Sequence, residues 1–158
     1  MHILRELGLV FHFIGLGMVA VGILSGPILS RILWKKLEGS AAEAKTAGEI
    51  LGRLGMIPTY GGLVLLASGL LMLQVEQWAR FGQIWLTAKL IIYVVMTLAG
   101  FIVAKPAGAR VMKLIASAVN DKTFDREEAA RLRRRMTIFG LFQAILFLSA
   151  ISLAVFKP

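Results

Sequence analysis

Four apolar stretches, each about as long as a membrane-crossing helix, constrain the fold of this chain more than any other feature. They run over residues 7–33, 54–73, 84–104 and 136–156, and none of them contains Asp or Glu. A helix needs about 20 mostly apolar residues to cross the hydrocarbon layer of a bilayer. The pattern therefore predicts an all-α fold, a transmembrane four-helix bundle that forms a single domain over residues 1–158.

Composition supports this fold class. Apolar residues make up 58% of the 158 residues, and the mean hydropathy is +0.77. A water-soluble domain of this size lacks the interior volume to hide so much apolar surface. The chain has no cysteine, which excludes disulfides, thiolate metal sites and cysteine nucleophiles.

The basic residues set the expected orientation. The net charge is +9, and Lys and Arg gather between the first and second stretches and between the third and fourth. Lys and Arg are enriched in cytoplasmic loops of membrane proteins, so we expect these loops in the cytoplasm and both termini outside (N-out, C-out). The same bias explains the charge without a nucleic-acid partner. A multi-pass protein of a bacterial inner (cytoplasmic) membrane is expected, because helical spans fit that membrane.

The second long loop is expected to contain helices. Residues 109–119 alternate apolar and basic positions as a short amphipathic helix does, and such a helix could lie on the anionic inner leaflet. Asp125 followed by Glu128 resembles a capping box that begins a helix leading into the fourth stretch. A solvated charged loop is the alternative. Three tryptophans fall near the predicted membrane boundaries, as interfacial indoles do: Trp34, Trp78 and Trp85.

Small residues indicate how the helices pack. In lipid, close packing through small side chains has to replace the hydrophobic effect between helices. The first stretch carries such residues on one side, namely Gly8, Gly15, Val19 and Gly26, with a GxxxG pair at Gly22 and Gly26. Polar residues in the stretches are expected to form hydrogen bonds between helices: Ser25, Ser68, Ser149, Ser152 and Gln143.

Two titratable residues inside the stretches are the candidates for function, because buried charge in a membrane is costly. His12 lies on the glycine side of the first stretch, and Lys89 shares a side of the third with Tyr93 and Met96. Each lies about five residues, or roughly 7 Å, inside the outer end of its stretch. Since both stretches begin at the outer face, both groups are expected at the same depth.

Three interpretations of this pair remain open. In the first, Lys89 extends to the interface and His12 forms a hydrogen bond with a neighbouring helix. In the second, His12 binds haem iron and Lys89 pairs with a propionate or relays a proton. The second axial ligand would be Met18, Met96, Tyr93 or a water. In the third, the pair gates a polar pathway for an ion or small molecule. A metal site made wholly of protein ligands is not expected, because the stretches contain one histidine and no carboxylate.

Several short motifs resemble a group of small bacterial four-helix membrane proteins. They are "FHFIGLGMVAVG", "GRLGMIPTYGG", "IWLTAKL" and the ending "VFKP". The group includes an uncharacterised family of predicted integral membrane proteins and, more distantly, the HemJ (protoporphyrinogen oxidase) and CopD-like proteins.

The resemblance to HemJ implies b-type haem bound near the outer leaflet and membrane redox chemistry, with His12 and Lys89 at the matching positions. Thr87 stands where the HemJ motif has a histidine, and no histidine follows Tyr93 in that helix, so the oxidase activity itself is not implied. The haem site expected on this basis consists of His12, Lys89, Tyr93 and Met96. The alternative function is a non-catalytic accessory or structural subunit. The expected partners are membrane lipid and either further copies of the chain or a larger membrane complex.

Overall fold

The computed structural model describes residues 2–78, 82–120 and 124–156, and within these ranges all regular structure is helical. The elements in chain order are α1 (His2–Gly39), α2 (Ala41–Leu54), α3 (Met56–Val75), α4 (Ile84–Ala99), the π-helix η1 (Gly100–Ala104), α5 (Lys105–Asn120) and α6 (Arg126–Phe156).

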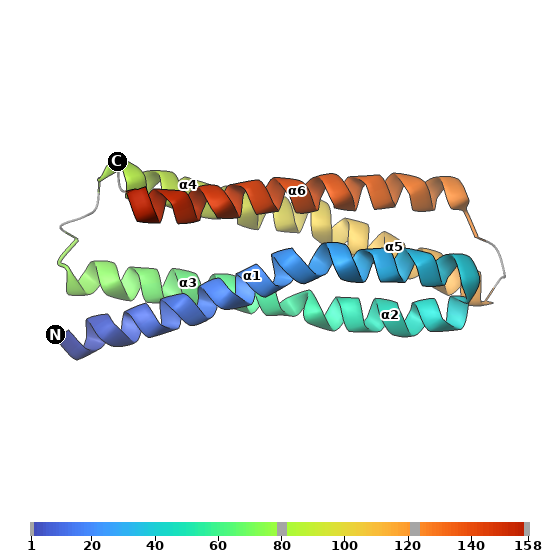
Figure 1. Ribbon diagram of the computed structural model, residues 1–158, viewed down its shortest axis with the longest axis horizontal. Helices are drawn as coiled ribbons and strands as arrows, with labels where there is room; N and C mark the ends of the chain where they lie inside the picture. Colours follow the sequence, from blue (N-terminus) through green and yellow to red (C-terminus); the bar gives the residue numbers. More distant parts are fainter. Residues whose placement is uncertain (1, 79–81, 121–123, 157–158) are drawn as a thin grey trace.

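These elements join into four long rods, each containing one of the four predicted spans. The rods are α1, α2 with α3, α4 with η1 and α5, and α6, and each has between 31 and 38 residues in a continuous apolar-centred run. At 1.5 Å per residue they measure roughly 46 to 57 Å, well beyond the roughly 30 Å of bilayer hydrocarbon. The all-α four-helix membrane bundle is confirmed. Figure 1 shows the rods side by side, with α1, α2 and α3 forming one layer and both termini at the same end.

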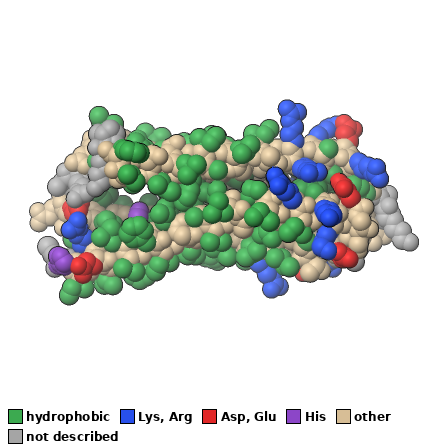
Figure 2. Space-filling model, in the orientation of Figure 1, with side chains coloured by type: hydrophobic (Ala, Val, Ile, Leu, Met, Phe, Trp, Pro, Cys, Tyr) green, Lys and Arg blue, Asp and Glu red, His purple; other side chains and the backbone are tan. Residues whose placement is uncertain are grey.

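The first segment expected to be a long loop is mostly helical, which corrects the sequence-based picture, and the second contains helices as expected. The α1 helix continues six residues past the predicted span to Gly39, and α2 begins after a single residue, Ser40. Ser40 caps α2, since its hydroxyl accepts a hydrogen bond from the backbone N–H of Glu43. The rods therefore extend beyond the membrane-crossing part as a bundle. We call this part, opposite the termini, the basic end, because Lys and Arg gather over it in Figure 2.

The predicted start of the last helix is confirmed. Asp125 Oδ1 accepts hydrogen bonds from the backbone N–H groups of Glu127 and Glu128, both at 2.9 Å. These bonds satisfy two of the N–H groups that a helix leaves without partners at its first turn. From this cap α6 runs without a break into the fourth span.

A π-helix joins the third span to α5. The N–H of Lys105 donates to the carbonyl of Gly100, five residues earlier, instead of four as in an α-helix. The wider turn holds one extra residue, which rotates everything after it by about 100° around the helix axis. Because of this rotation, the apolar side of α5 faces a different direction from the one that the side chains of α4 would predict for an unbroken α-helix.

The tightly packed hydrophobic core lies at the basic end, outside the apolar centre of the bundle. It is formed where α1, α2, α5 and α6 meet, by Leu33, Trp34, Leu37, Ala44, Ala107, Val111, Leu114, Ile115, Ala129 and Leu132. In contrast, none of the most apolar 18-residue window of the third rod is buried. This division follows from the solvent on each part of the bundle. Water drives apolar side chains together at the basic end, whereas in the membrane the lipid is itself apolar and does not drive them together.

The core changes the interpretation of two predictions. The amphipathic helix expected at 109–119 exists as part of α5, but its apolar side does not lie on a leaflet. Val111, Leu114 and Ile115 are at most 6% exposed and pack inside the bundle. Trp34, expected at the membrane interface, is only 4% exposed in the same core, where its Nε1 donates to the Ser30 hydroxyl.

Candidate functional site

The site region begins with an unusually close approach of α1 and α3. A Cβ placed on Gly15 would lie 2.9 Å from both the carbonyl oxygen of Gly61 and the amide nitrogen of Leu65. A Cβ on Gly61 would lie 2.6 Å from the Cβ of Met18. Only glycine fits at both positions, so the packing through small residues predicted for the first span is confirmed there. The prediction is wrong for Gly26, where no atom lies within 4 Å of a built Cβ.

This close contact brings His12 of α1 against Ser68 of α3. Nδ1 of His12 lies 3.0 Å from Oγ of Ser68, and Ser68 is 4% exposed. The Ser68 hydroxyl donates to the carbonyl of Val64 at 2.7 Å. The Ser68 hydroxyl also lies 3.1 Å from the carbonyl oxygen of Leu65. When the hydroxyl hydrogen points at either carbonyl, the hydrogen in the contact with His12 comes from Nδ1, because a hydroxyl has one hydrogen to donate. That arrangement has the ring proton on Nδ1 and the lone pair on Nε2.

Gly69 leaves room for the ring, since a Cβ there would lie 3.8 Å from Cε1 of His12. The His12 side chain is partly exposed in the bundle. In Figure 2 a histidine side chain is visible inside a hollow between the two layers of helices, near the end that carries the termini.

Lys89 of α4 lies near enough for its positive charge to act on the His12 ring. This supports the expectation that the two groups share one depth of the bundle. The Nζ of Lys89 also lies 5.4 Å from the centre of the Trp85 ring, one turn earlier on α4, within the range of a cation–π contact.

Tyr93 and Met96, the other two expected site residues, connect α4 to its neighbours. The Tyr93 hydroxyl donates to the carbonyl of Gly62 on α3 at 3.2 Å. The backbone carbonyl of Met96 accepts a hydrogen bond of 3.0 Å from Nε2 of Gln143 on α6. The structure therefore places the Lys89 charge within electrostatic range of His12, while the contacts of Tyr93 and Met96 join α4 to α3 and α6.

The expected interhelical hydrogen bonds are confirmed for Ser68 and Gln143 and wrong for Ser149. Ser149 donates to the carbonyl of Ile145 on its own helix. The role of Ser68 as the partner of His12 was not predicted. Its spacing from Gly61, seven residues or about two turns of α3, is the signal in the sequence that places it on the α1-facing side.

No group of three or more His, Cys, Asp or Glu residues that could hold a metal ion occurs in the described parts of the chain. A metal ion at His12 would need most of its ligands from elsewhere. A porphyrin supplies four nitrogens to its iron and leaves the axial position to a protein side chain, which is the role a single imidazole can fill.

The chain matches a model of a known protein family. The family model described as "Predicted integral membrane protein (DUF2269)" matches residues 11–158, nearly the whole chain and including both His12 and Lys89. No curated protein and no protein of solved structure gives a significant match.

Proposed function

The chain belongs to this family of predicted integral membrane proteins, and from that premise we propose that it binds one b-type haem through His12 and takes part in membrane redox chemistry. The haem would lie between the layers of helices, toward the end that carries the termini. Bound haem supplies one-electron chemistry. The residues of this chain bind and orient it.

The observation that carries the proposal is the hydrogen bond between His12 and Ser68. Histidines that bind metals almost always donate their second ring N–H to a fixed acceptor, which sets the tautomer and the ring orientation. Ser68 can serve as this acceptor, because its own hydrogen can be donated to the carbonyl of Val64 or of Leu65.

Lys89 supplies the second element of recognition. Haem b carries two propionate groups, and an ammonium group inside a membrane is stable only beside an anion, an aromatic ring or a polar surface. Lys89 has the Trp85 ring beside it and acts on the His12 ring across the bundle. In the haem complex it would pair with one propionate.

The test is the reduced-minus-oxidised absorption spectrum of the protein purified in a mild detergent after expression with a haem precursor. We expect Soret and α bands in the unaltered protein and their loss in His12→Ala. Ser68→Ala should retain the bands and weaken haem affinity about 10- to 100-fold, the usual effect of removing such a partner.

Ser149→Ala is the matched control, since it removes a serine hydroxyl that bonds only within α6. It should leave haem affinity unchanged. A protein without haem bands in membranes as well as after purification, or bands that persist in His12→Ala, would refute the proposal.

A non-catalytic subunit of a membrane complex is the second candidate. It is favoured by the third rod, whose most apolar window has no buried residue and thus offers its whole outer surface to another protein or to lipid. In that case the protein should co-purify with a stable partner, and His12→Ala should leave the association intact.

A further inference from the structure

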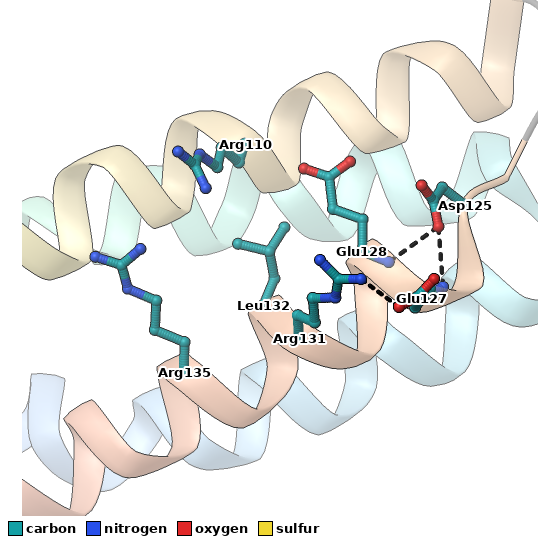
Figure 3. A pocket seen from close by; sticks show the side chains of 7 residues that line it. All are labelled: Arg110, Asp125, Glu127, Glu128, Arg131, Leu132 and Arg135. Carbon is teal, nitrogen blue, oxygen red and sulfur yellow. Dashed lines mark hydrogen bonds and ion pairs between the residues drawn. The ribbon is translucent and has the colours of Figure 1, made fainter.

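Two grooves run along opposite sides of α6 at the basic end. One lies between α1 and α6, has a volume of about 560 Å³, and we call it the α1–α6 groove. Its lining includes three arginines, Arg126, Arg133 and Arg134, together with Glu38, Trp34 and Ile138. The other lies between α5 and α6 and is the pocket drawn in Figure 3.

The three arginines of the α1–α6 groove have unused binding capacity. None of their guanidinium groups forms an ion pair, hydrogen bond or ring contact with another described residue. The groove has one carboxylate, Glu38, against these three positive charges. A guanidinium group binds phosphate oxygens through two parallel hydrogen bonds. The groove is therefore suited to a phosphate ester.

The position of the groove along α6 indicates where this phosphate comes from. Arg133 and Arg134 lie two to three residues before the predicted start of the fourth span, or roughly 3–5 Å outside the hydrocarbon at 1.5 Å per residue. Lipid phosphates lie in this layer. The groove continues past them to Ile138, which is 57% exposed within the span. A ligand with a phosphate and attached hydrocarbon chains matches both parts.

The α5–α6 groove differs in its charge. It contains three arginines but also three carboxylates, at Asp125, Glu127 and Glu128. Figure 3 shows Arg131 paired with Glu127, and Asp125 bound to the backbone at the start of α6. Its positive charge is thus balanced from within the protein. Arg110 and Arg135, at the other side of this groove, provide a matched control.

We propose that the α1–α6 groove binds the headgroup phosphate of an anionic phospholipid from the leaflet at the basic end. Arg133 and Arg134 hold the phosphate, and Arg126 adds positive charge farther from the membrane. The acyl chains lie along the apolar surface of α6 that begins at Ile138. Basic pockets beside membrane helices bind anionic headgroups by the same combination of charge and apolar contact.

Native mass spectrometry of the full-length protein, titrated with phosphatidylglycerol or phosphatidylcholine in detergent, tests this site. We expect retention of phosphatidylglycerol in preference to phosphatidylcholine. In the double variant Arg133→Gln/Arg134→Gln, affinity for phosphatidylglycerol should fall about 10- to 30-fold. The control Arg110→Gln/Arg135→Gln removes the same charge from the other groove and should change affinity less than threefold. Circular dichroism checks that both variants are folded.

Three results would overturn the proposal. Equal retention of both lipids would show that the phosphate charge is not recognised. An equal loss of affinity in the two double variants would show a general effect of surface charge. Displacement of the lipid by millimolar glycerol phosphate would identify a soluble phosphate ester as the ligand. If one of the double variants does not fold, Arg133→Lys/Arg134→Lys replaces it, because this variant keeps the charge but loses the paired hydrogen bonds. Its affinity for phosphatidylglycerol should fall by less than the about 10- to 30-fold expected when the charge is removed.

Discussion

Replacing Gly15 by alanine should destabilise the protein through the α1–α3 contact on which the His12 site depends. The new Cβ would lie 2.9 Å from two backbone atoms of α3, against 3.4 Å or more for an ordinary contact. The shortfall of about 0.5 Å falls on backbone, which cannot rotate away as a side chain can, so the helices must separate. Overpacking of this kind costs about 1–3 kcal/mol.

Gly17→Ala is the matched control two residues along the same helix. No atom lies within 4 Å of a Cβ built on Gly17. Alanine there relieves the poor helix propensity of glycine and should stabilise the protein by about 0.5–1 kcal/mol. The two variants make the same chemical change, and their free energies of unfolding should differ by about 1.5–4 kcal/mol on adding the two effects.

Unfolding in mixed micelles of mild detergent and SDS, followed by circular dichroism, measures this difference. Gly61→Ala, whose Cβ would lie 2.6 Å from that of Met18, should resemble Gly15→Ala. If Gly15→Ala proves as stable as Gly17→Ala, the helices are not in contact at this point, and the close approach that brings His12 to Ser68 would be wrong.

Two further predictions follow from buried polar groups and from charge. Gln143→Leu loses the 3.0 Å hydrogen bond to the Met96 carbonyl, but it also removes the buried Oε1 that has no partner among the described residues. Because these effects oppose each other, the free energy of unfolding should change by less than about 1 kcal/mol. A loss above about 2 kcal/mol would mean that Oε1 has a partner. The basic end should be cytoplasmic and both termini should be outside. A reporter enzyme that is active only outside the cytoplasm should therefore be active when it is fused to either terminus. Activity of a cytoplasm-specific reporter at either terminus would show that the orientation is reversed.

Much of the membrane-crossing part could be predicted from the sequence. The four spans follow from length and hydropathy, because in lipid each segment must satisfy its own backbone hydrogen bonds and only a helix does so. The inward position of His12 followed from the glycines on the same side of the helix, and the cap at Asp125 from its spacing to Glu128. These features depend on local geometry and on the solvent, and both can be worked out from residues close together in the chain.

The tertiary structure decided what covers each of these surfaces. The apolar side of α5 was predicted from its periodicity, but periodicity does not distinguish a membrane surface from other helices. The contacts of Val111 and Ile115 in the core show that this side of α5 packs against other helices. The partner of His12 is 56 residues away in the chain, and the arginines of the α1–α6 groove come from a run whose members face both sides of α6. The sequence by itself thus determined which surfaces are apolar, basic or titratable. Which of them meet depends on contacts between distant segments, which no local pattern contains.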